Sequence, residues 1–215
     1  MGSATSVTLY LSGTSLVVAM FASGCAMFEP RAEAYVPPPV GSTWTQSFRN
    51  TGSYGKDEQR QFTRTEGTWQ GKNAVALKMS NGATIMLDPE NGGWLAIVAP
   101  NGKPVLSWEP PIGWQYPLYV GRSWTISHRQ TAYAANRVTT FDWTCKVEGY
   151  GDVTVPAGTF KAFEIACSST TGNNDRYWYS PDMSIFVKTS FTRTANNPAG
   201  QGTQQAELIS QNIKK

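Results

Sequence analysis

The stretch Val40–Arg49 (VGSTWTQSFR) returns later in the chain as Val120–Arg129 (VGRSWTISHR), with six of ten positions identical. Each copy begins with a glycine where a turn is expected, and then alternates large and polar side chains. The first copy places Trp44, Gln46 and Phe48 on one face of an extended segment, because successive side chains of a strand point to opposite faces. Each copy therefore predicts a turn followed by a half-buried β-strand.

The correspondence continues more loosely beyond these copies, since Leu87-Asp88-Pro89 and Tyr179-Ser180-Pro181 each precede an apolar strand. We interpret the repeat halves as residues 40–108 and 119–213, approximately, joined by the proline-rich connector Glu109–Leu118. Two copies are too few for a stacked solenoid, which needs at least three repeats. They fit two halves of one sheet or barrel. Chance similarity of two turn-and-strand segments is the alternative.

Turn-forming residues punctuate the whole domain. Asn81-Gly82 and Asn91-Gly92-Gly93 separate short apolar runs with the chemistry of β-hairpin turns. The chain has 20 Gly, 13 Pro, 8 Trp, 9 Tyr and 9 Phe, and this mixture favours strands over helices. We therefore predict an all-β domain over residues 40–213, an antiparallel curved sheet or open barrel of about a dozen strands, built from two duplicated halves.

The N-terminus is a separate element, because residues 1–28 contain no acidic or basic side chain. Leu16–Ala22 is an apolar run that meets the small residues Ser23 and Gly24 just before Cys25. This layout is typical of a secretory signal peptide, here residues 1–24. The apolar run is well short of the ~20 residues that a membrane span requires. An uncleaved membrane helix or an ordinary signal peptide without lipid are the alternatives.

The segment Ala22–Cys25 resembles the lipobox of bacterial lipoproteins. The resemblance implies that Cys25 carries lipid, and that the signal is cut before it. Ala26 follows the cysteine instead of Asp, which by the same resemblance points to the outer membrane and a domain facing the periplasm. Residues 25–39 then form a lipid-anchored tether, ending in the extended, polyproline-like Tyr35–Pro39.

Three cysteines are present, and lipid on Cys25 would leave Cys145 and Cys167 as a pair in an oxidising compartment. Both lie on expected strands with a turn between them, at Pro156–Gly158, so a disulfide is predicted. Two buried free thiols are the alternative. A zinc site would need more ligands than two cysteines and the single histidine, so we predict no metal and no cofactor.

Four aromatic residues crowd the connector and its flanks: Trp108, Trp114, Tyr116 and Tyr119. Aromatic side chains in a proline-rich loop can contact a hydrophobic ligand. They can equally cover the end of a β-core, since Trp and Tyr bury a large area while their polar tips reach partners. The sequence does not distinguish these two interpretations.

No catalytic constellation emerges. His128 is the only histidine, and its repeat counterpart is Phe48, which indicates a half-buried strand position in place of a catalytic base. Asp88 and Glu90 are interpreted as turn residues and not as the paired carboxylates of a glycosidase. The sequence contains no phosphate-binding loop motif. The net charge of +3 without a Lys and Arg cluster does not suggest nucleic acid. We predict that the chain is not an enzyme.

The second half resembles a family of bacterial envelope proteins of unknown function. The resemblance rests on Tyr116–Leu118, Val120–Trp124, Val153–Phe160, Trp178–Pro181 and Glu207–Ser210. That family is thought to be antiparallel β, loosely similar to periplasmic lipoprotein carriers. The resemblance implies the fold of an envelope protein of unknown molecular function. Together with the many aromatic residues and the expected membrane tether, it favours a membrane-anchored envelope lipoprotein that binds a hydrophobic ligand. The alternative is a structural or assembly lipoprotein that acts through contacts with an envelope protein.

Overall fold

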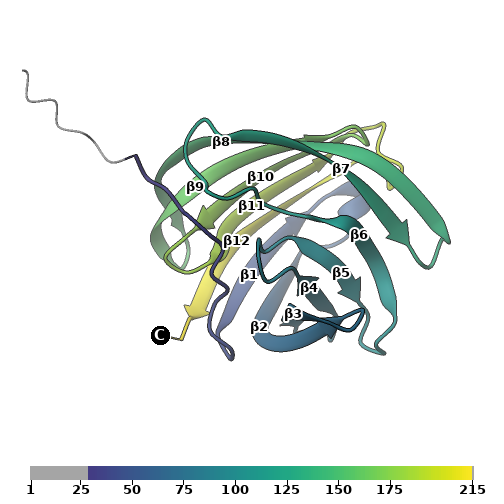
Figure 1. Ribbon diagram of the computed structural model, residues 1–215, viewed down its shortest axis with the longest axis horizontal. Helices are drawn as coiled ribbons and strands as arrows, with labels where there is room; N and C mark the ends of the chain where they lie inside the picture. The colour runs from purple at the N-terminus through teal and green to yellow at the C-terminus, as the bar shows by residue number, and fades with distance from the viewer. Residues whose placement is uncertain (1–28, 215) are drawn as a thin grey trace, which may run out of the picture.

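The structure of the protein is a computed structural model, which describes residues 29–214. Twelve antiparallel strands follow one another around a closed barrel (Figure 1). The strands are β1 (Thr43–Asn50), β2 (Glu58–Trp69), β3 (Lys72–Met79), β4 (Thr84–Leu87), β5 (Trp94–Val98), β6 (Pro104–Ile112), β7 (Ser123–Ala132), β8 (Arg137–Val155), β9 (Gly158–Ser169), β10 (Asn173–Ser180), β11 (Ile185–Arg193) and β12 (Gly202–Asn212). The short 3-10 turn η1 (Gly52–Tyr54) connects β1 to β2. No helix in the described part of the chain is long and apolar enough to cross a membrane.

The all-β antiparallel prediction is confirmed, and the sheet, which was expected to be curved or an open barrel, is a closed barrel. β1 pairs with β12 along its whole length, from Thr43 opposite Asn212 to Asn50 opposite Gln204. Because each strand also pairs with its neighbours in sequence, the sheet has no free edge. The barrel therefore has two ends, each formed by alternate turns.

The two copies of the repeat occupy equivalent places, since they form β1 and β7 of the twelve strands. The turn glycines Gly41 and Gly121 have φ of 83° and 91°, a left-handed conformation that favours glycine. The Gly41 amide donates to the carbonyl of Arg64, and the Gly121 amide donates to that of Val147, both at 2.8 Å. The geometry agrees with two similar halves, while a duplication in the history of the chain stays a prediction.

The predicted connector Glu109–Leu118 is in part a strand, which corrects its boundary. β6 runs on to Ile112, and Trp108 lies within it. The register of β6 against β5 jumps from Ser107 to Ile112, and β6 pairs with β7 only as far as Glu109. Pro110 and Pro111 therefore sit where the hydrogen-bond ladder is interrupted, as residues without an amide proton require.

Residues 29–39, here called the strap, lie against the barrel (Figure 1, darkest segment). Ala32 and Leu118 exchange both backbone hydrogen bonds, at 3.0 and 2.8 Å, and Leu118 is fully buried. The ring of Tyr35 lies 6.5 Å from that of Tyr116, between centroids. Burial of these apolar side chains holds the segment in place. The described part of the predicted tether is therefore docked on the barrel.

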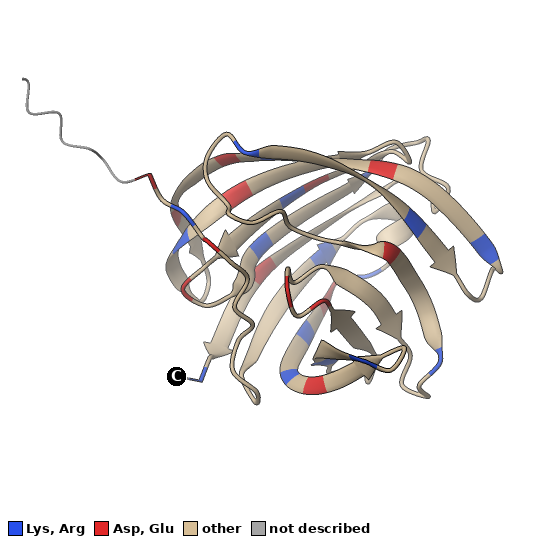
Figure 2. Ribbon diagram, in the orientation of Figure 1, with Lys and Arg blue, Asp and Glu red and all other residues tan. Residues whose placement is uncertain are grey.

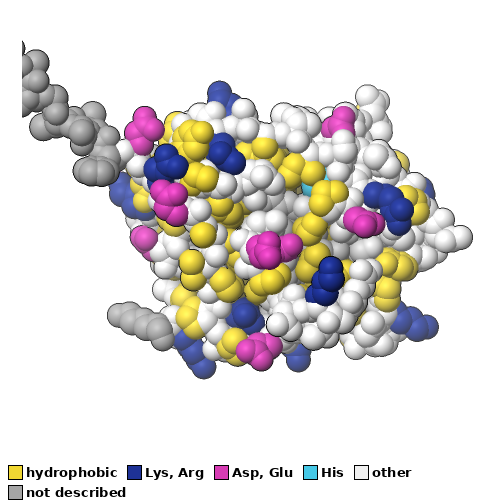
Figure 3. Space-filling model, viewed as in Figure 1, with side chains coloured by type: hydrophobic (Ala, Val, Ile, Leu, Met, Phe, Trp, Pro, Cys, Tyr) yellow, Lys and Arg dark blue, Asp and Glu magenta, His cyan; other side chains and the backbone are white. Residues whose placement is uncertain are grey.

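The barrel wall has an apolar inner face and a polar outer face. On β8, Phe141, Trp143 and Val147 are buried, while Asp142, Lys146 and Glu148 between them are not. Charged residues of both signs are spread along the strands (Figure 2). On the face shown in Figure 3, neither sign gathers into a continuous patch. The inside of the barrel is therefore where an apolar site can form.

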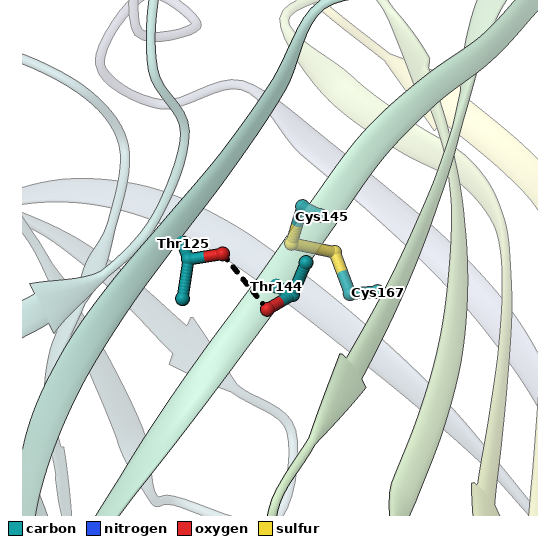
Figure 4. The surroundings of a disulfide bond; sticks show 4 residues. All are labelled: Thr125, Thr144, Cys145 and Cys167. Carbon is teal, nitrogen blue, oxygen red and sulfur yellow. Dashed lines mark hydrogen bonds between the residues drawn. A yellow bond between two sulfur atoms is a disulfide. The ribbon is translucent and has the colours of Figure 1, made fainter.

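The predicted disulfide is confirmed between Cys145 on β8 and Cys167 on β9 (Figure 4). These residues stand directly opposite each other in the antiparallel register, and both side chains are buried. On the neighbouring outer face, the hydroxyl groups of Thr125 and Thr144 form a hydrogen bond of 2.9 Å. The disulfide closes a loop of 22 residues. Because this loop restricts the unfolded chain, it stabilises the folded protein by about 3 kcal/mol.

Candidate functional site

The barrel encloses a cavity of about 440 Å³, here called the main cavity. Its rim includes Tyr54 of η1, Thr171 of the β9–β10 turn and Asn197 of the β11–β12 loop. These turns lie at the barrel end opposite to the start of β1 and the strap, because turns alternate between the ends. Ala199 and Arg137 in the rim are exposed, so the main cavity reaches the surface there. We call this the open end.

The floor of the main cavity is built from indole rings. Trp94 of β5 and Trp108 of β6 meet edge to face, with centroids 6.0 Å apart. Trp114 meets Trp143 of β8 at 5.6 Å and Tyr177 of β10 at 4.8 Å. All of these side chains line the main cavity. Pairs of this kind prefer edge-to-face contact, which fixes their mutual orientation and makes the floor rigid.

Trp114 reaches the interior because the chain after β6 passes very close to the β4–β5 loop. A Cβ atom at Gly113 would lie 2.5 Å from the Cα of Gly93, so neither position tolerates a side chain without a shift of the backbone. This close approach turns residue 114 inward, where it is 5% exposed. A pair of glycines thus places the central indole of the site.

A second, smaller cavity of about 110 Å³ lies between the main cavity and the strap. Tyr35 of the strap lines it, together with Trp44, Phe62 and Leu87. Trp114 lines both cavities, as do several residues around it. The indole of Trp114 therefore stands between the two spaces.

The four aromatic residues predicted as ligand contacts separate into two groups. Trp108 and Trp114 line the main cavity. Tyr116 contacts Tyr35 of the strap. The guanidinium groups of Arg31 and Arg122 lie over the ring of Tyr119, 5.1 and 5.8 Å from its centroid. Tyr116 and Tyr119 are outside both cavity linings and serve the strap side of the barrel, whereas ligand contact by Trp108 and Trp114 stays a prediction.

A buried carboxyl group lies near the open end. Asp175 of β10 is 7% exposed, lines the main cavity, and has one oxygen, Oδ1, without a hydrogen-bond partner in the described structure. Burial raises the pKa of Asp175 to about 7, against the lowering effects of its hydrogen bonds and of Arg193. Asp175 is not among the site residues predicted from the sequence. The alternation of Asp175 with Tyr177 and Tyr179 was the signal that it faces inward.

His128 is more deeply buried than the predicted half-buried position, with no exposed surface. Its Nδ1 donates to the carbonyl oxygen of Pro110 at 2.9 Å, and Nε2 has no partner in the described structure. Its ring packs against Phe141 and Trp143. Burial lowers the pKa of His128, which keeps the ring neutral. Its surroundings are aromatic, so the residue acts as a packed core side chain.

The predicted lipid attachment site, Cys25, lies outside the described residues, as does the predicted signal peptide, residues 1–24. Within residues 29–214, no group of three or more His, Cys, Asp or Glu side chains could hold a metal ion. The expectations of no cofactor and no catalysis stay predictions.

No protein-family model matches the chain, and no curated protein matches it. Among solved structures, the chain is similar to a candidate lipoprotein from Parabacteroides distasonis, with a TM-score of 0.44, 13% identity, and coverage of 84% of this chain and 99% of that one. It is also similar to a candidate exported protein with a YmcC-like fold from Bacteroides fragilis, with a TM-score of 0.43, 12% identity, and coverage of 84% and 100%. The hypothetical lipoprotein YmcC from Escherichia coli has a TM-score of 0.44 and 10% identity, over 80% of this chain and 85% of that one.

Proposed function

We propose that the protein is an exported envelope lipoprotein whose barrel binds a hydrophobic ligand in the main cavity. The observation that carries the proposal is the cavity of about 440 Å³ with its floor of indole rings. That volume lies in the range of roughly 300–1,000 Å³ typical of small-molecule sites. Each methylene group that leaves water for such a floor contributes about 0.8 kcal/mol to binding.

The position of the strap supports one orientation of the barrel relative to the membrane. Cys25 precedes Glu29 by four residues, and four extended residues span at most about 14 Å. A lipid on Cys25 would therefore keep the strap side of the barrel close to the membrane. The open end would then point away from the anchoring membrane, where a ligand can enter from the periplasm or from a partner.

Replacing Cys25 by serine is expected to release the protein from membranes, because serine cannot accept the thioether-linked lipid that anchors the chain. The measurement is fractionation of cell envelopes, with Phe28→Ser as a control that changes the same segment and keeps the cysteine. A Cys25→Ser protein that has lost residues 1–24 and still stays with membranes after carbonate washing would contradict the lipid anchor. It would leave the cavity proposal untouched.

Binding in the main cavity is tested by a tryptophan placed inside it. Thr139 lines the main cavity, whereas its neighbour Val138 points outward and is 56% exposed. In a Cys25→Ser background, which needs no detergent, the neutral probe N-phenyl-1-naphthylamine should bind with a saturable rise in fluorescence. Thr139→Trp fills part of the cavity and should weaken binding at least about tenfold, or about 1.4 kcal/mol.

Val138→Trp is the matched control, because it adds the same indole to the outer face of the same strand. It should bind the probe as the parent protein does. If the parent protein does not bind the probe at all, or if both tryptophan variants bind equally well, a hydrophobic ligand in this cavity is excluded. The alternative function, a structural or assembly lipoprotein working through protein contacts, would then be favoured.

A further inference from the structure

The lining of the main cavity is apolar at its floor and charged toward the open end. Its ionisable members include three arginines, Arg60, Arg137 and Arg193, against the single carboxyl group of Asp175. The two kinds of surface suit a molecule with an apolar tail and a polar head. The sign of the charged part then decides which head group fits.

Arg60 contributes little free positive charge to the main cavity. Its guanidinium forms an ion pair with Glu58 of the same strand and lies over the ring of Phe48, 4.6 Å from the centroid. The charge is thus balanced locally by a carboxylate outside the cavity lining. Arg60 thus contacts side chains of both β2 and β1.

Arg193 and Arg137 are different, because none of the ion pairs in the described structure includes either of them. Arg193 at the end of β11 lies over the ring of Tyr54, 3.9 Å from the centroid. Its Nη1 also donates to the Ser53 hydroxyl at 3.2 Å. These neutral contacts hold the guanidinium in place at the rim and leave its charge unneutralised. Arg137, at the start of β8, is exposed at the same rim.

Asp175 forms no ion pair with Arg193 or Arg137 in the described structure, although Arg193 is near enough to lower the pKa of its carboxyl group. The ionisable groups near it are Arg193 on β11, Tyr54 of η1 and Tyr177 on its own strand, while β9 presents Cys167, which is held in the disulfide. Its buried Oδ1 has no partner in the described structure. When protonated, this carboxyl group can donate a hydrogen bond to an anion in the cavity.

We infer that the ligand of the main cavity is a single-tailed amphiphile with an anionic head, carboxylate or phosphate, which is held at the rim by Arg193 and Arg137. The inference rests on the proposed function and adds the chemical class of the ligand. Guanidinium groups match both kinds of anion, because their paired N–H groups fit two oxygens at once. The tail lies along the indole floor.

The test compares four compounds that share one dodecyl tail: dodecanoate, dodecyl phosphate, dodecanol and dodecyltrimethylammonium. Each displaces N-phenyl-1-naphthylamine from the Cys25→Ser protein, below the concentration at which it forms micelles. We expect at least one anion to bind at least tenfold more tightly than the alcohol, and the cation to bind no better than the alcohol. The tighter of the two anions identifies the head group.

Two substitutions test whether the preference for an anion arises from the arginines at the rim. Arg193→Gln and Arg137→Gln should each weaken binding of the preferred anion about threefold to tenfold, and leave dodecanol unchanged. Arg129→Gln removes the same charge from the outer face of β7, where Arg129 is ion-paired with Glu109, and should change nothing. Arg137 is exposed, so its variant should fold even if Arg193→Gln does not, as circular dichroism will show.

The outcomes separate the two proposals. Equal affinity for anion and alcohol, preference for the cation, or an anion affinity that neither rim variant changes would overturn the anionic ligand. In all three cases the probe still binds and the hydrophobic cavity stands. Failure of the probe and of all four compounds to bind would instead overturn the proposed function itself.

Discussion

Trp114→Ala is expected to lower the free energy of unfolding by about 3–5 kcal/mol, the cost of removing a large buried aromatic side chain and leaving a cavity. Trp114 is 5% exposed and has four aromatic neighbours with centroids between 4.8 and 6.5 Å: Trp124, Trp143, Tyr177 and Phe186. Each of these contacts is lost at once. Urea unfolding followed by far-ultraviolet circular dichroism measures the loss, and the melting temperature should fall by roughly 10 °C.

Two controls separate this effect from the loss of any tryptophan. Trp178 is half-buried on the outside of β10, 5.5 Å below the ammonium group of Lys188, and Trp178→Ala should cost clearly less. Trp114→Phe keeps an aromatic ring in place and should recover much of the loss. If the free energy of unfolding of Trp114→Ala is within about 1 kcal/mol of that of the parent protein, the prediction is wrong. The barrel would then have collapsed to fill the cavity that the indole leaves.

Removal of the same indole should also change the tail length that the cavity prefers. Trp114 lines both the main cavity and the smaller cavity beside Tyr35, so its loss is expected to enlarge the space that they share. If the variant folds, the preferred tail of a bound amphiphile should become longer by several methylene groups. The stability loss and the altered length preference therefore report on one side chain in two independent ways.

The parts of the fold that the sequence predicted depend on local rules. The turn glycine and alternation of Val40–Arg49 and Val120–Arg129 were sufficient to place β1 and β7, because a left-handed turn and a two-residue period leave marks within ten residues. Cys145 and Cys167 lay on neighbouring strands of a predicted hairpin, so their pairing followed from the register. Closure of the sheet between β1 and β12 has no such local mark.

Only part of the site could be predicted from the sequence. The composition of Tyr35–Pro39 is that of an extended linker and predicts a tether. The two backbone hydrogen bonds between Ala32 and Leu118 join residues far apart in the chain, so no local pattern predicts that the strap docks. Trp114 enters the cavity because Gly93 and Gly113 touch, which no sequence spacing reveals. Asp175 appeared as one polar residue among several, since its burial results from closure of the whole barrel.

Asp175→Asn is expected to stabilise the protein at pH 8, and to change its stability little near pH 4. Burial raises the pKa of Asp175 from its ordinary value of 3.8 to about 7, so the folded protein holds a proton that the unfolded chain has lost between these pH values. Stability contributed by this group is thus present at low pH and is lost as the pH rises from about 4 through 7. With about 1.4 kcal/mol for each pKa unit, the loss above pH 7 is at most about 4 kcal/mol.

Asparagine has nearly the shape of a protonated aspartic acid and carries no charge at any of these pH values, so the variant should lack this slope. Urea unfolding at pH 4.5, 6, 7 and 8 measures the difference, and the gain should grow with pH and level off above pH 7. Asp182→Asn, at an exposed position after β10, is the matched control and should show no such trend. A gain that is the same at every pH, or a variant destabilised at pH 8, would mean that the Asp175 carboxylate is satisfied in the folded barrel. In that case the carboxylate needs no proton to remain buried beside Arg193, and the positive charge at the rim is already balanced without a ligand.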